Sequence, residues 1–150
     1  VSIEAIRRSD GTYEAYTDYG REGSGMDAFE WAVRAVELGA GELMVTSIDR
    51  EGTGGGFDLE LTRAIATAVP VPVIASGGAG VMGHVLEVIE SGRADAVALA
   101  SILHYDAIRH VDKDDPEFQQ EGNVDGIFLE KGKALGKRIA QLALKLKCIE

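Results

Sequence analysis

Three apolar runs of this sequence end in residues that could bind or transform a ligand. They are followed by Ser76-Gly77-Gly78, by residues 47–53 and by Ala100-Ser101. In a parallel α/β protein the carboxyl ends of the strands meet at one edge, which is where ligands bind. A Gly-Gly pair lets the backbone approach a ligand closely, and the start of a following helix suits a phosphate. A tight turn without a ligand is the alternative for such a pair taken alone.

Carboxylates are the groups best suited to acid–base chemistry here. Glu4 lies in a strand-like run over residues 1–6, and Glu42 opens a nearly apolar run over 42–48 that leads to Asp49 and Glu51. A carboxylate can take or give a proton when burial or a like charge moves its pKa. The pattern alone also allows Glu4 to be a surface residue at a strand end, and Glu42 to be solvated.

The elements alternate along the chain, and this alternation predicts an α/β fold with parallel strands and right-handed crossovers. A hairpin is expected over 7–19 because Asp10-Gly11 is a strong turn signal. Residues 20–25 read as a flexible loop, either a flap over a ligand or a linker. Strands are expected at 1–6, 42–48, 73–76 and 94–100, and helices at 27–38, 58–69 and 80–91. Four such strands make an open sheet or half of an eight-stranded barrel.

The composition and charge of the chain argue against some classes of function. The chain has 150 residues and a net charge of −10, with a pI near 4.7, so a basic surface for nucleic acid or membrane is not expected. The single Cys148 cannot form an internal disulfide and fits a reducing cytoplasm. The chain begins at Val1 in a strand-like run, and we expect it to be a piece of a longer chain.

The pattern changes near residue 105. Residues 1–105 are expected to form one α/β unit, and residues 106–150 a loop followed by an amphipathic helix packed on it. The helix is expected over 131–147, where a leucine and isoleucine stripe runs beside many Lys and Arg residues. A contact of its basic face with an acidic partner is the alternative to a solvated face.

Several of these motifs together resemble one known family. Residues 39–43, 46–53, 74–80 and 100–101 are similar to the C-terminal half of the cyclase subunit of imidazole glycerol phosphate synthase, an enzyme of histidine biosynthesis. The resemblance covers roughly residues 1–105. It implies strands five to eight of a (βα)8 TIM barrel, and a reaction of ammonia with a phosphorylated ribulosyl-formimino carboxamide nucleotide. The ammonia comes from a glutaminase partner, and no cofactor or metal is implied.

The resemblance also implies roles for individual residues. Glu4 matches a catalytic acid/base position where the family has Asp, and the second catalytic carboxylate lies on strand one, outside this chain. Glu42 matches a charged gate for ammonia at the barrel floor. The implied substrate- and phosphate-binding positions are Thr46, Asp49, Glu51, Gly52, Ser76, Gly77, Gly78, Ala100 and Ser101.

Departures from the family pattern keep other functions open. Glu4 and Glu51 each replace an Asp, and Tyr19 stands where the family usually has Ser. The alternatives are a related amidotransferase synthase subunit acting on another sugar, the sister phosphoribosyl isomerase, and a noncatalytic phosphate-binding half-barrel or folding fragment. Because four parallel strands leave open edges, we expect this piece to self-associate or to pair with another half-barrel.

Overall fold

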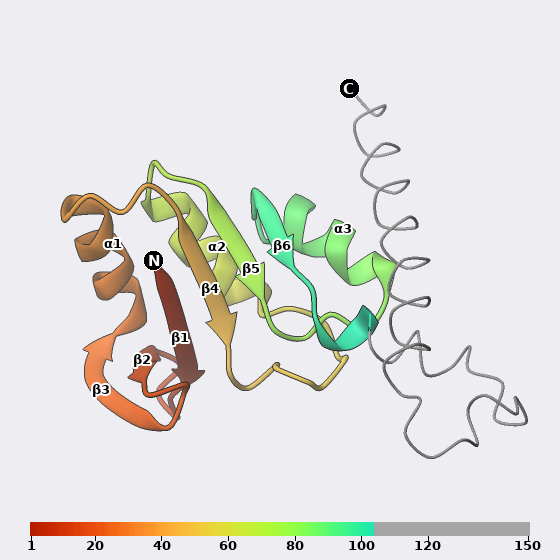
Figure 1. Cartoon of the computed structure of the whole chain (residues 1–150), viewed down its shortest axis with the longest axis horizontal. Coiled ribbons are helices and arrows are strands. Elements are labelled where there is room, and N and C mark those ends of the chain that lie inside the picture. Colours follow the sequence, from red (N-terminus) through yellow and green to blue (C-terminus); the bar gives the residue numbers. More distant parts are fainter. Residues whose placement is uncertain (104–150) are drawn as a thin grey trace, which may run out of the picture. The chain divides into compact units, whose positions relative to one another are not determined.

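The computed structural model describes residues 1–103, and within them a mixed six-stranded sheet carries helices on one face (Figure 1). The predictions for residues 106–150 lie outside the described residues. The strands are β1 (Ser2–Arg7), β2 (Tyr13–Thr17), β3 (Glu22–Asp27), β4 (Leu43–Ser47), β5 (Val73–Ser76) and β6 (Ala96–Ala98). The helices are α1 (Ala28–Glu37), α2 (Leu59–Ala68) and α3 (Met82–Glu90). No helix in this part of the chain is long and apolar enough to cross a membrane.

The sheet order is β3-β2-β1-β4-β5-β6, in which β1, β4, β5 and β6 are parallel. Strands β2 and β3 add an antiparallel hairpin at the β1 side. This arrangement confirms the predicted α/β fold with the βα units of a half-barrel. Strand and helix alternate from β3 onward, so α2 and α3 each connect two neighbouring parallel strands, while α1 connects the hairpin to β4.

The core lies between the sheet and the helices. Alternate residues of β1 and β4 point into it, among them Ile3 and Val45, and they meet Leu61 and Ile65 of α2. A second cluster joins Ala75 to Val88 of α3. The other residues of the parallel strands, such as Glu4 and Thr46, are half-buried and lie on the opposite face. We call this opposite face, which no helix of the described part covers, the inner face.

Two helix starts follow the sequence prediction. Asp27 caps α1 by accepting hydrogen bonds from the backbone N–H groups of Phe29 and Glu30, and Asp58 caps α2 through the N–H of Leu61. Helix α3 differs, because it begins at Met82 rather than at Gly80, and its cap residue Val81 makes no side-chain hydrogen bond. The glycines of the Gly77-Gly78 turn therefore stand several residues before the helix.

The segment predicted as a flexible loop over residues 20–25 is largely strand β3, and this prediction was wrong. Side chains of β2 and β3 hold it in place. The Gly25 N–H donates to the Glu14 carboxylate at 2.8 Å, and the Ser24 hydroxyl donates to the Ala15 carbonyl at 2.5 Å. Because the first hydrogen bond favours the charged form, it lowers the pKa of Glu14. These hydrogen bonds hold the segment in the sheet, although its sequence lacks the alternation of apolar and polar residues that is typical of a strand.

A buried phenol fastens the hairpin to α2. Tyr13, only 9% exposed, donates its hydroxyl to the Asp58 carboxylate at 3.0 Å. The Arg7 guanidinium lies 5.6 Å from the centre of the Tyr13 ring and forms an ion pair with Glu60 of α2 at 2.8 Å. Burial, and then the negative charge of Asp58, raise the pKa of the Tyr13 phenol well above its usual range.

Tyr13→Phe should reduce the loss of stability that the protein shows as the pH rises above about 10. In the unfolded chain a tyrosine ionises near pH 10, whereas the folded protein must keep Tyr13 neutral at higher pH. Stability is therefore complete below about pH 10 and falls as the pH rises further, by up to about 1.4 kcal/mol per pH unit. Denaturant unfolding from pH 8 to 11 measures this slope.

The matched control for this experiment is Tyr19→Phe, because Tyr19 is 88% exposed whereas Tyr13 is buried. It should keep the wild-type slope, while Tyr13→Phe flattens it. At neutral pH Tyr13→Phe should also cost about 1–3 kcal/mol, since it removes a hydrogen bond to a charged group. Equal alkaline slopes for Tyr13→Phe and wild type would contradict the assignment.

Candidate active site

A row of polar side chains crosses the inner face of the sheet. The register pairs Glu4 with Thr46 on β4, and Thr46 with Ser76 on β5. The row continues to Ala98 on β6 and, on the other side, to Tyr16 on β2. Because all these residues are at equivalent pleat positions, their side chains project from the same face. Glu4 and Ser76 are two strands apart, which is roughly 10 Å.

The Glu4 carboxylate lies beneath the turn that joins β2 to β3. A side-chain carbon placed on Gly20 would lie 3.5 Å from Glu4 Oε2 and 2.9 Å from Ile48 Cδ1. Gly20 and the two residues before it, Asp18 and Tyr19, all have positive φ. The turn thus folds tightly over the inner face, and glycine at position 20 leaves the space that Ile48 and the Glu4 carboxylate occupy.

A pocket of about 130 Å³ lies where β5 and β6 end. It is open to solvent, and most of the residues that line it are small. Its lining residues are Glu51, Gly52, Ser76, Gly77, Gly78, Ala79, Ala98, Leu99, Ala100, Ser101 and Ile102. Seven of the sequence-predicted site residues are among them. Ser76 and Ala98 belong to both the pocket and the polar row, so the two are continuous.

The glycines of the pocket wall meet a second glycine-rich loop. The Gly56 N–H donates to the Gly78 carbonyl at 2.8 Å, and a side-chain carbon on Gly78 would lie 2.1 Å from the Gly56 carbonyl oxygen. Gly78 also has a φ of +105°. The sequence analysis explained Gly78 by access for a ligand. The structure shows that contact between the two loops already excludes any larger residue there.

Two carboxylates of the loop after β4 have different surroundings. Asp49 accepts a hydrogen bond from the Arg7 backbone N–H at 2.8 Å, so it joins this loop to the end of β1 and does not line the pocket. Glu51 does line the pocket, and its Oε2 lies 3.2 Å from the position of a side-chain carbon on Gly77. Glu51 brings negative charge to the pocket and can accept hydrogen bonds from hydroxyl groups of a ligand.

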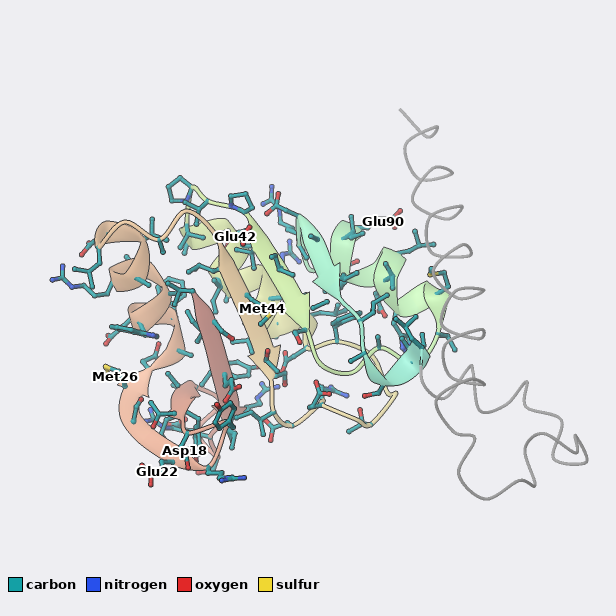
Figure 2. All side chains as sticks on the ribbon, in the orientation of Figure 1. Asp18, Glu22, Met26, Glu42, Met44 and Glu90 are labelled. Atoms are coloured by element: carbon teal, nitrogen blue, oxygen red, sulfur yellow. The ribbon has the colours of Figure 1, made fainter. Side chains whose placement is uncertain are left out.

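Glu42 is far from this group. It is exposed and directly precedes β4, at the edge where the parallel strands begin. Figure 2 shows Glu42 at that edge, with Met44 further along the strand and Asp18 near the opposite edge. The Val1 amino group donates to the Glu42 backbone carbonyl at 2.9 Å. The structure thus separates Glu42 from the pocket by the length of the sheet.

The sequence analysis missed some residues of this region. Tyr16 and Gly20 flank Glu4 from the hairpin, Ile48 packs beneath the turn, and His84 of α3 contacts the Gly80 backbone. Tyr16 could not be found from the turn signal alone, because the observed register is centred on Asp10, whereas a two-residue turn at Asp10-Gly11 would place Thr17 opposite Glu4. The contacts of Gly20 and His84 depend on loops that fold back over the sheet.

Comparison with known families agrees with this geometry. Residues 1–109 match the family described as histidine biosynthesis protein, which covers all of the described sheet and both sides of the pocket. This family comprises enzymes of histidine biosynthesis, isomerases and cyclases, that act on sugar phosphates. A half-barrel with a polar inner row and a pocket of small residues at the strand ends is consistent with such a substrate. The chain therefore belongs to the histidine biosynthesis protein family.

Proposed function

We propose that this chain forms half of the barrel of a cyclase that makes imidazole glycerol phosphate from ammonia and a phosphorylated ribulosyl-formimino carboxamide nucleotide. An aminoimidazole carboxamide nucleotide is the second product. The observation that carries the proposal is the continuity of the Glu4–Thr46–Ser76 row with the pocket at the ends of β5 and β6. A phosphate in the pocket would place the attached sugar along this row.

Each part of the site has a chemical task in this proposal. Backbone N–H groups of Gly77, Gly78 and Ser101 bind the phosphate, because these residues line the pocket and a backbone N–H carries partial positive charge. The hydroxyls of Thr46 and Ser76 hydrogen-bond the sugar. The Glu4 carboxylate transfers protons as the ring closes, and a second carboxylate outside this chain completes the acid–base pair.

The substrate that is consumed tests the proposal. The test uses this chain together with the half-barrel that carries the second catalytic carboxylate, which we call the completed barrel. It is supplied with ammonium and the ribulosyl-formimino nucleotide in one assay, and with the phosphoribosyl precursor of the isomerase in another. We expect product only in the first assay, as imidazole glycerol phosphate and the aminoimidazole carboxamide nucleotide in equal amounts. Turnover of the isomerase precursor alone would assign the chain to the other branch of the family, and turnover of neither would reject both activities.

Glu42 is proposed to control the entry of ammonia, since it lies at the edge of the sheet opposite the pocket. Glu42→Gln should lower glutamine-dependent turnover in the complex with the glutaminase by several-fold. Turnover with added ammonium should change little, because free ammonia reaches the site from solvent. The ratio of the two rates is the measured quantity, and Glu90→Gln on α3, also exposed, is the control. Equal losses in both assays would remove Glu42 from the ammonia path.

A further inference from the structure

His84 occupies an unusual position beside the pocket. It is the third residue of α3, and its Nδ1 accepts a hydrogen bond from the Gly80 backbone N–H at 3.2 Å. Because Nδ1 accepts, the proton of the neutral imidazole is on Nε2. The cap residue Val81 offers no side-chain acceptor at the start of this helix. His84 thus accepts a hydrogen bond from a backbone N–H group that lies just before the helix.

The imidazole also lies near the second loop of the pocket region. A side-chain carbon placed on Gly56 would lie 3.7 Å from His84 Cδ2 and 3.8 Å from Nε2, so there is room for about one carbon between Gly56 and the ring. Gly56 is the residue whose N–H binds the Gly78 carbonyl. His84 is therefore hydrogen-bonded to one glycine-rich loop and lies close to the other.

These two loops determine the shape of the pocket wall. A side-chain carbon on Gly80 would lie 2.0 Å from the Gly54 carbonyl oxygen, so the loops run in direct backbone contact from Gly54 to Gly56 and from Gly78 to Gly80. Gly77, Gly78 and Ala79 line the pocket. A glycine-rich backbone loses much conformational freedom when it is ordered, so such a wall needs fixed points to keep its N–H groups aligned.

We propose that His84 is a positioning residue for anion binding in this pocket. Through its hydrogen bond with the Gly80 N–H it holds the Gly77–Gly78 backbone in the orientation that binds a phosphate. This role rests on the proposed phosphate site but not on the cyclisation reaction. His84 does not line the pocket, so it acts through the loops and not by contact with the ligand.

Three substitutions separate the hydrogen bond of His84 from the space that its ring fills. His84→Ala removes both the hydrogen bond and the ring. His84→Phe keeps a ring near Gly56 but has no acceptor for the Gly80 N–H. His84→Asn provides a side-chain oxygen close to the position of Nδ1, which can accept from Gly80. Leu86→Ala, on the same helix and 46% exposed, is the matched control outside both loops.

Thermal unfolding of the full chain in a titration with inorganic phosphate is the test. Wild type and Leu86→Ala should be stabilised by phosphate to the same extent. His84→Ala and His84→Phe should bind phosphate roughly 3- to 10-fold more weakly, as expected for the loss of one hydrogen bond, and His84→Asn should recover most of the affinity. Each variant is compared with itself without phosphate, so a general loss of stability does not affect the result.

The completed barrel gives a second measurement. There the His84→Ala and His84→Phe variants should raise KM for the phosphorylated substrate by a similar factor while kcat stays within about 2-fold, because binding is weakened equally in ground and transition states. Phosphate affinity in both variants equal to that of wild type would overturn the proposal. A wild type that phosphate does not stabilise would reject the phosphate site and this role with it. Phosphate binding that depends on His84, in a protein that does not cyclise the nucleotide, would support the role and reject the cyclase.

Discussion

Gly78→Ala should destabilise the protein far more than an alanine at another glycine of the same backbone conformation. The new side chain would meet the Gly56 carbonyl at 2.1 Å and Arg50 Cβ at 3.0 Å, at a φ of +105°. Backbone strain contributes about 1–3 kcal/mol, and the displacement of the neighbouring loop a similar amount. The total of roughly 2–6 kcal/mol is a large part of the stability of an ordinary domain.

Gly39→Ala separates these two contributions. Gly39 ends α1 with a φ of +103°, but a side-chain carbon there would have nothing within 4 Å. It should therefore show the strain alone, without the collision. Denaturant unfolding of both variants measures the difference, and a phosphate titration should show binding in Gly39→Ala but not in Gly78→Ala. Equal destabilisation by the two substitutions would show that contact between the loops does not hold the pocket wall.

Glu4→Gln should lower kcat of the completed barrel by about 100- to 10,000-fold, the range for loss of a general acid or base. Glutamine has nearly the same volume, so the packing of Ile48 and the Gly20 turn should be retained. KM should change little, because the phosphate pocket lies two strands away. Steady-state kinetics with saturating ammonium give both constants.

Glu14→Gln is the matched control for Glu4→Gln. Glu14 lies on β2, next to the β1 strand that carries Glu4, but Arg8 binds its carboxylate at 3.2 Å and the Gly25 N–H binds it at 2.8 Å. Its charge serves the strand pairing of β2 and β3, so we expect a modest loss of stability and a kcat near wild type. If Glu14→Gln lowered kcat as much as Glu4→Gln, the loss of activity would follow from removal of any carboxylate in this part of the sheet and would not identify Glu4 as the proton-transfer group.

Local patterns predicted much of this fold because they act over short distances. The strand predicted over 42–48 is present, with Leu43, Val45 and Ser47 buried and with Met44 and Thr46 on the inner face. The helices predicted from residues 27 and 58 begin there, because the caps Asp27 and Asp58 act on the next three residues alone. Small residues at three strand ends predicted the position of the pocket, since parallel strands bring those ends together.

The errors concern contacts between segments distant in sequence. Strand β3 was predicted as a loop because its glycines carry no apolar pattern, whereas Glu14 and Ala15 on β2 supply its partners. Helix α3 was predicted two residues early, since Gly80 is packed against Gly54 and stays outside the helix. Neither contact has a signal in the local sequence, because each depends on how one loop folds over another.

The single-turnover rate of ring closure shows whether Glu4 transfers protons in a cyclase. Excess completed barrel is mixed with the ribulosyl-formimino nucleotide and ammonium, so product release does not limit the observed rate. The proposed site predicts a rate at least 100-fold below wild type for Glu4→Gln, a rate near or above wild type for Glu4→Asp, and an unchanged rate for Glu14→Gln. A Glu4→Gln variant that closes the ring as fast as wild type would contradict it.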